Sequence, residues 1–230
     1  MDVDPLVTKL AQPTLFDLGE TSFGALELFP SVWSAAEALT FPDVSTRRAG
    51  LERLAKLNAV RLSPLVAYLV ATRLSDPDIE LRTRVVQVIA EVLAPDNQGQ
   101  AAPEPVLQQL KGYLSQMRTR QLFALLQVAD FDPSSEPYIA ALLNACPYAG
   151  HNLANIMTDR KALLGVRKQA AYFIGRVGYL DALPALERTA ARLESRLSGQ
   201  QSMPFATVEP CDESVLLPAV LDTLNLLRAP

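Results

Sequence analysis

The chain has 230 residues, of which 49% are hydrophobic and 20% charged, and its formal net charge is −4. A chain of this length and composition can bury a sizeable core, which excludes extensive intrinsic disorder and allows one or two domains. The acidic balance of the whole chain does not indicate a polyanion-binding protein. The charge is uneven, because residues 1–43 carry a net −6 and the other 187 residues carry +2.

We expect neither a membrane span nor a secretion signal in this sequence. No apolar run approaches the ~18–20 residues that cross a bilayer, and the N-terminus is acidic where a secretion signal would be basic. Cys146 and Cys211 are too few for a disulfide framework and lack metal-site spacing. We therefore expect a cytoplasmic protein with reduced thiols that does not bind a membrane.

In chain order, residues 1–24 are expected to form an acidic N-terminal arm or cap, and residues 25–230 a domain of repeated helix pairs. Helical periodicity dominates this domain, and prolines precede many of the apolar runs, where the first helical turn tolerates them. The first helices of five pairs are predicted at residues 31–40, 63–74, 104–116, 135–145 and 181–197.

A shared pattern defines the second helix of each pair. Residues 42–57 align with residues 77–92 at an offset of 35: both begin with Pro-Asp, and apolar residues follow the arginine at +4, +7, +8 and +10. Further copies start at Arg118 and Arg167, and a degraded copy starts at Leu217. The later copies are separated by insertions of about 14 residues. These insertions predict a short helix around residues 149–157 and a long exposed loop at residues 198–212.

The best copies, residues 76–93 and 163–190, resemble HEAT repeats, in particular the short bacterial HEAT-like repeats of the phycobilisome-lyase type. The resemblance covers about residues 30–228. It implies an all-α α-solenoid, a right-handed superhelix of about five stacked helix pairs, in which the second helices line the concave side.

The same resemblance implies a ladder of turn aspartates and second-helix arginines that holds successive pairs in register. The third and fourth copies depart from the pattern, because Leu114 and Leu163 stand where the aspartate would be. The residues that match the ladder are Asp43, Arg47, Asp78, Arg82, Arg118 and Arg167.

Side chains that point away from the core of the second helices define a candidate binding surface. Exposed aromatic and arginine side chains are enriched where proteins bind one another. A solvated helix face with Phe123 and Tyr172 half-buried between repeats is the alternative interpretation. The candidate binding residues are Arg84, Arg120, Phe123, Lys168, Tyr172 and Arg176.

Patterns for catalysis and for metal or phosphate binding are not found in the sequence. His151 is the single histidine and has no flanking signature, and the ten glycines form no phosphate-binding loop. We therefore expect no catalytic residue, no metal and no cofactor.

Together these features predict a non-catalytic scaffold or adaptor that binds a protein or peptide on its concave face. Two alternatives stay open. One is nucleic-acid binding or alkylpurine DNA glycosylase-like activity on the same face, which the pI of about 5.1 and the single tryptophan, Trp33, disfavour. The other is a chromophore-lyase-like activity, which the repeat type alone allows. Salt-dependent affinity would distinguish nucleic acid from a protein partner.

Overall fold

A computed structural model of the chain describes residues 29–201 and 215–229. The predicted acidic arm at residues 1–24 lies outside these residues, as does the larger part of the predicted loop at residues 198–212. Every regular element in the described part of the chain is a helix, which confirms the predicted all-α class. None of these helices is long and apolar enough to cross a membrane.

Most of the described helices overlap the predicted ranges. A short helix at residues 59–62 was not predicted, and one helix continues to residue 201, into the predicted loop. In the first half of the chain they are α1 (Pro30–Ala38), α2 (Val44–Lys56), α3 (Ala59–Leu62), α4 (Pro64–Thr72), α5 (Ile79–Leu93) and α6 (Glu104–Ser115). In the second half they are α7 (Thr119–Phe131), α8 (Glu136–Asn144), α9 (Ala149–Thr158), α10 (Leu164–Val177), α11 (Leu183–Gln201) and α12 (Leu216–Arg228). Short 3-10 turns lie ahead of α5, α8 and α11: η3 (Arg73–Ser75), η4 (Pro133–Ser135) and η5 (Leu180–Ala182).

Local chemistry sets the ends of several helices. The Asp43 and Asp78 carboxylates accept the backbone N–H groups of Thr46 and Leu81, each at 2.8 Å, and so cap α2 and α5. A proline stands in the first turn of α1, α4, α6 and α8, where no intrahelical N–H bond is lost. Helix α10 ends at Gly178, whose φ of 86° lies in the left-handed region that glycine adopts freely.

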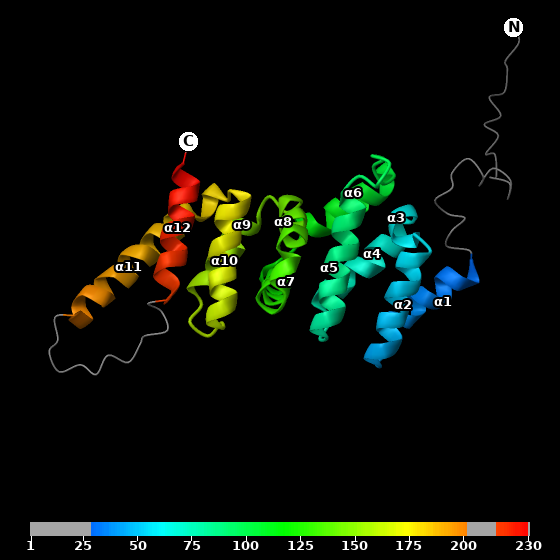
Figure 1. The fold of residues 1–230 in the computed structure, drawn as a ribbon, viewed down its shortest axis with the longest axis horizontal. Helices are drawn as coiled ribbons and strands as arrows, with labels where there is room; N and C mark the ends of the chain where they lie inside the picture. Colours follow the sequence, from blue (N-terminus) through cyan, green and yellow to red (C-terminus); the bar gives the residue numbers. More distant parts are fainter. Residues whose placement is uncertain (1–28, 202–214, 230) are drawn as a thin grey trace, which may run out of the picture.

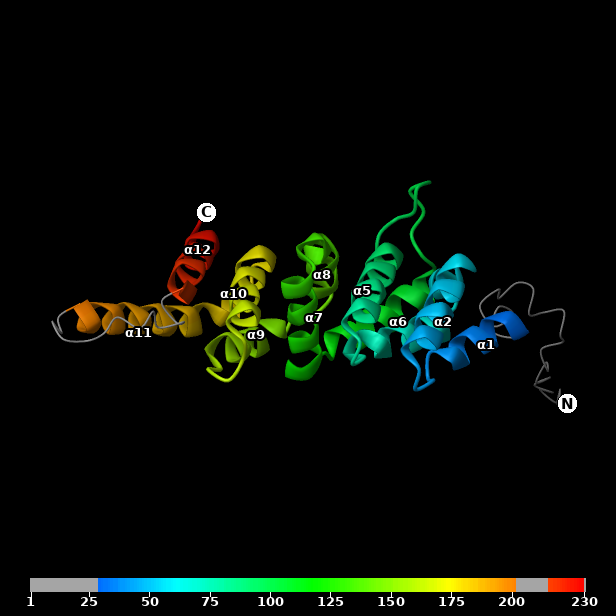
Figure 2. The same ribbon diagram turned by 60° about the horizontal axis from the view of Figure 1, so that its bottom comes forward.

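The helices follow one another along the long axis of the molecule, from α1 at one end to α11 and α12 at the other (Figures 1 and 2). Sequence neighbours pack as pairs, namely α1 with α2, α9 with α10 and α11 with α12. Two ion pairs join α2 to α5: Arg48 pairs with Glu80 and, one turn further along both helices, Glu52 pairs with Arg84. Helices α2 and α5 therefore lie side by side and run in the same direction. Helix α10 contacts α7 on one side and α12 on the other.

The middle of the molecule departs from the predicted order of pairs. Arg82 at the start of α5 bonds Gln127 near the end of α7, and Gly165 at the start of α10 lies against Asp130, also near the end of α7. Helix α7 therefore runs opposite to both α5 and α10. Helix α8 contacts α5 and α10 as well, and α9 is the main partner of α10.

Two predictions are corrected by this arrangement. Residues 118–128 were predicted to form a second helix parallel to the other second helices, but they form α7, which runs in the opposite direction. Residues 135–145 were predicted to form the first helix of the pair with α10, but α9 is the helix that pairs with α10. The physical reason is the tight turn after α7, where the Asp132 carboxylate accepts the N–H of Ser134 at 3.0 Å and the chain folds back at once into α8. Apolar periodicity marks the buried face of a helix but is the same for either direction.

A single hydrophobic cluster joins the helices, reaching from Val32 in α1 to Leu224 in α12. Close approach of neighbouring helices depends on glycine at one position in α2. A Cβ atom at Gly50 would lie 2.8 Å from the carbonyl oxygen of Ala35 in α1, well inside van der Waals contact. Adjacent pairs of helices therefore share a continuous core and do not form separate domains.

Candidate functional site

The predicted binding residue Arg84 is engaged with side chains of its own chain. It lies on α5, and its Nε donates to the Glu52 carboxylate of α2 at 2.7 Å. Its Nη1 reaches Gln87 at 3.4 Å. The bond to Glu52 raises the pKa of the Arg84 guanidinium. A partner that used Arg84 would have to compete with a carboxylate that is already in place.

Three other predicted residues gather on α10 around a carboxylate of α8. The Tyr172 hydroxyl donates to Glu136, and the Nε of Arg176 lies 3.6 Å from an oxygen of the same group. Burial, together with the bond to Glu136, raises the pKa of Tyr172. Lys168 lines a cleft of about 230 Å³ beside Glu136 and Tyr172. The cationic face predicted here is thus partly neutralised by Glu136.

The six predicted binding residues do not form one continuous surface. Phe123 is half-buried and packs against the core, whereas Arg120 in the first turn of α7 is exposed. Helix α8 lies between α5 and α10 and separates Arg84 from Tyr172 and its neighbours. The structure therefore brings together Lys168, Tyr172 and Arg176, and it leaves the other three apart.

The predicted ladder residues near α2 bind neighbouring groups in a different pairing from the one implied. The buried Arg47 donates to Asp76 at 2.8 Å and to the carbonyl of Pro42 at 2.7 Å. Its neighbour Arg48 holds Asp78 with two nitrogens. Asp43 accepts bonds from its own helix, through Ser45 and Thr46.

The remaining ladder arginines differ in their surroundings. Arg82 is buried and donates to Gln127 at 2.8 Å. Arg167 is buried and donates to the carbonyl of Met157 at 2.8 Å. Arg118 stands exposed at the start of α7, so its environment is unlike that of the other three.

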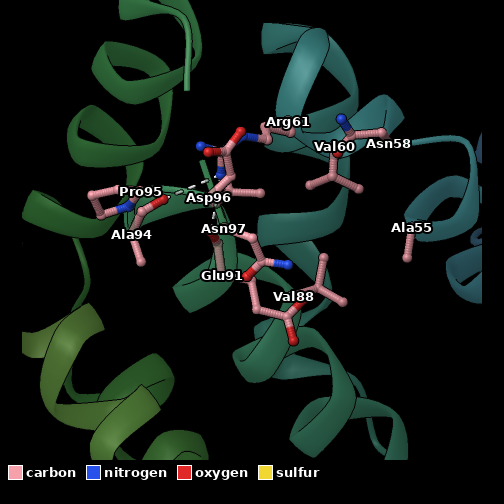
Figure 3. A pocket seen from close by; sticks show the side chains of 11 residues that line it. Ala55, Asn58, Val60, Arg61, Val88, Glu91, Ala94, Pro95, Asp96 and Asn97 are labelled. Carbon is pink, nitrogen blue, oxygen red and sulfur yellow. Dashed lines mark hydrogen bonds between the residues drawn. The ribbon is translucent and has the colours of Figure 1, made fainter. Parts of the chain in front are cut away.

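A cleft of about 480 Å³ opens where the turn between α2 and α3 faces the end of α5 (Figure 3). Its apolar lining comes from Ala55, Val60, Val88, Val92, Ala94 and Pro95. Its polar lining comes from Asn58, Arg61, Glu91, Asp96 and Asn97. Figure 3 shows Arg61 and Asp96 beside each other, with Asn58, Val60 and Ala55 on the side of α2 and α3.

Backbone bonds fix the polar groups of this cleft. Arg61 donates to the carbonyls of Glu91 and Ala94 at 3.1 Å each, and also to that of Gln100. Asp96 accepts the backbone N–H groups of Gln100 and Gln98, at 2.8 and 2.9 Å, and these bonds lower the pKa of its carboxyl. Arg61 is therefore satisfied by the end of α5 and the loop that follows. The Glu91 side chain, by contrast, is 61% exposed, and the Nη1 of Arg84 lies 4.0 Å from its carboxylate.

None of the six predicted binding residues lines this cleft. Most of its polar lining comes from turns and a loop, and the pattern of apolar repeats carries no information about such segments. One signal was present: residues 94–100, APDNQGQ, combine Pro, Asp, Asn and Gly in the way that is typical of a structured turn.

Groups that could do chemistry are few in the described chain. His151 is exposed, and its backbone N–H donates to Asp181 at 3.0 Å. Cys146 is buried, and burial raises the pKa of its thiol, which disfavours the reactive thiolate. Among the described residues no group of three or more His, Cys, Asp or Glu side chains could hold a metal ion. Cys211 lies outside them.

Comparison of the chain with protein-family models, with curated proteins and with solved structures found no match. The resemblance to HEAT repeats therefore depends on the residues of the chain itself.

Proposed function

We propose that this protein is a non-catalytic binding scaffold of the HEAT-like solenoid type, and that a segment of a partner protein binds in the cleft between the α2–α3 turn and the end of α5. The observation that carries the proposal is the make-up of this cleft, which combines an apolar lining with an ordered polar rim. Polar residues line the cleft in nearly the same number as apolar ones, five against six, and a few placed polar groups in a concave site orient a ligand.

The chemistry of the cleft favours a basic side chain as the guest. Two carboxylates, Glu91 and Asp96, face one guanidinium, Arg61, so the charged lining has a net charge of −1. Arg61 already donates to three carbonyls, whereas Glu91 is exposed at the rim. A lysine or arginine of the partner can lay its methylene stem along Ala55, Ala94 and Pro95, the apolar lining residues that are accessible, and place its charge near the carboxylates.

The neighbouring surface supports a protein partner over nucleic acid. Arg84 and Arg176, two of the four cations on the predicted face, lie beside Glu52 and Glu136. Phosphate groups would have to displace these carboxylates, and the counterion release that drives nucleic-acid binding would be correspondingly smaller. In the cleft, the exposed Glu91 carboxylate is 4.0 Å from the nearest Arg84 nitrogen, a looser contact than the 2.7 Å bond between Arg84 and Glu52, so a basic residue of a partner displaces less there.

The test is a selection of random peptides displayed on phage against the full-length wild-type protein, followed by affinity measurements on Glu91→Lys. The Glu91 side chain is exposed, so its charge can be reversed at little expected cost to folding. We expect selected peptides with a Lys or Arg next to apolar residues, and a loss of affinity in Glu91→Lys of up to about tenfold. Glu194→Lys, an exposed substitution on α11, serves as the matched control and should bind like wild type.

Two outcomes would count against the proposal. Peptides that bind wild type and Glu91→Lys equally well would place the site elsewhere. Binding of labelled duplex DNA that falls steeply with salt, measured by fluorescence anisotropy, would favour the nucleic-acid alternative.

A further inference from the structure

Arg192 on α11 differs from the other buried or half-buried arginines of the described chain in how its nitrogens are satisfied. Both its Nε and its Nη2 are shielded from solvent and have no hydrogen-bond partner among the described residues. Arg47 and Arg82 each leave only Nε in that state; the Nη2 of Arg47 donates to Asp76 and the Nη1 of Arg82 donates to Gln127. Burying an uncompensated charged donor is costly, so the two free nitrogens call for an acceptor.

The two free nitrogens of Arg192 belong to one edge of the guanidinium. The same edge of Arg48 shows its use in this protein, where Nε and Nη2 hold Asp78 at 3.1 and 2.8 Å. Such an edge presents two parallel N–H groups, which match a pair of oxygens on a carboxylate or a phosphate. Arg192 thus has two adjacent N–H donors that can bind an oxyanion and that have no acceptor among the described residues.

A cleft of about 240 Å³ adjoins Arg192, between α9 and α11. This volume is several times the ~30 Å³ share of one water molecule in the liquid. Among the described residues no carboxylate lines this cleft, whereas two guanidinium groups do. The lining residues are Ala154, Asn155, Thr158, Ala185, Arg188, Thr189 and Arg192.

The other polar groups of this cleft do not supply the missing acceptor. The Thr158 hydroxyl donates to the carbonyls of Ala154 and Asn155, and the carbonyl of Met157 accepts Arg167. The Thr189 hydroxyl donates to its own helix. The carbonyls of Ala154, Asn155 and Met157 therefore already accept hydrogen bonds from other side chains.

We propose that this cleft is a binding site for a phosphate group, held by the Nε–Nη2 edge of Arg192 with Arg188 as the second cation. Arg188 uses its Nε on the carbonyl of Pro184 at 3.1 Å, and its side chain is exposed, so its terminal nitrogens can turn toward a ligand. A phosphate group carries about 1.5 to 2 negative charges at neutral pH and so balances two guanidiniums better than a carboxylate, which carries one. The site is independent of the cleft at α5.

The first experiment is a calorimetric titration of the full chain with inorganic phosphate at constant ionic strength. We expect saturable binding that Arg192→Met weakens about tenfold or more, because a bidentate charge-assisted contact is lost. Arg188→Met should weaken it less, and Arg53→Met, an exposed arginine of α2, should leave it unchanged. Acetate should bind at least about tenfold more weakly than phosphate. Equal affinity of wild type and Arg192→Met, or of acetate and phosphate, would overturn the proposal.

Thermal stability gives a second and independent readout. Without ligand, Arg192→Met should raise Tm by about 2–4 °C, because the variant no longer buries an unpaired charge; phosphate should raise the Tm of wild type but not of the variant. A Tm that falls in Arg192→Met without phosphate would show that Arg192 serves the fold, and would contradict the assignment. O-phosphoserine in place of inorganic phosphate distinguishes a phosphate ester from the free ion, and binding of either that depends on Arg192 supports the site.

Discussion

Two adjacent arginines and two nearby aspartates connect the first helix pairs. Arg47 binds Asp76 and Arg48 binds Asp78, so both bonds run from α2 to the segment that starts α5. Alignment of the repeats identified Asp78 because Asp43 stands at the same position in the preceding copy. It could not identify Asp76, whose counterpart 35 residues earlier is Phe41. Which carboxylate meets which arginine depends on the path of the turn, and a repeat pattern does not encode that path.

Removal of Asp76 tests the buried member of these pairs. The side chains of Arg47 and Asp76 are only 7% and 2% exposed. We expect Asp76→Ala to lower the free energy of unfolding by about 3–5 kcal/mol, because Arg47 would be left buried and unpaired. Urea denaturation followed by circular dichroism measures this change.

The exposed pair between Glu187 and Arg228 provides the control for Asp76→Ala. Its side chains are 46% and 59% exposed, so Glu187→Ala should cost at most about 1 kcal/mol. Similar losses in the two variants would contradict the assignment of Arg47–Asp76 as the stabilising contact.

The cap at Asp43 predicts a dependence of stability on pH. Hydrogen bonds from Ser45 and Thr46 lower the pKa of its carboxyl from 3.8 to about 2. The ionised cap therefore contributes stability above pH ~4, and this contribution is lost as pH falls toward 2. Asp43→Asn keeps a capping oxygen without the charge, so its stability should fall less than that of wild type between pH 5 and 2. Denaturation curves of wild type and Asp43→Asn, measured at each pH, give the two free energies of unfolding. Identical pH profiles of the two proteins would contradict the role of the ionised Asp43 cap.

At the scale of elements, the sequence predicted where helices lie better than how they pack. The predicted ranges 63–74, 104–116 and 135–145 each contain a described helix. The direction of α7 and the insertion of α8 between α5 and α10 were not predicted, because the apolar spacing of a helix is unchanged by reversal. The face that Phe123 and Tyr172 were expected to share is divided by α8 for the same reason.

The substitution Gly50→Ala tests the close contact of α1 and α2. In an open helix Gly→Ala stabilises by about 1 kcal/mol, but at Gly50 the new Cβ would lie 2.8 Å from the Ala35 carbonyl and 2.9 Å from the Ala38 Cβ. We expect Gly50→Ala to destabilise the protein by about 1–3 kcal/mol. Chemical denaturation measures the change.

Gly112 in α6 supplies the matched comparison for Gly50. A Cβ there would meet no described atom within 4 Å, so Gly112→Ala should stabilise the protein by about 0.5–1 kcal/mol. If both variants gained stability, the tight approach of α1 to α2 would be refuted.

For the whole molecule, hydrophobic periodicity accounts for the continuous core, since apolar positions repeat along the chain and each helix covers the next. The candidate cleft follows from features that do not repeat. The left-handed Asn58, with φ 55°, begins α3, and the loop after α5 carries Asp96. Turns and loops often carry binding residues, and a pattern of apolar spacing contains no information about them, which is why the sequence did not locate this cleft.

The proposal that a basic partner segment binds this cleft is tested most directly by methyl-selective NMR of the full-length protein, titrated with a lysine-centred peptide from the selection. The account predicts saturable shifts of the Ala55 and Ala94 methyl signals, which weaken in Glu91→Lys and persist in Glu194→Lys. Shifts confined to methyl groups around Tyr172, or the same shifts in both variants, would contradict it.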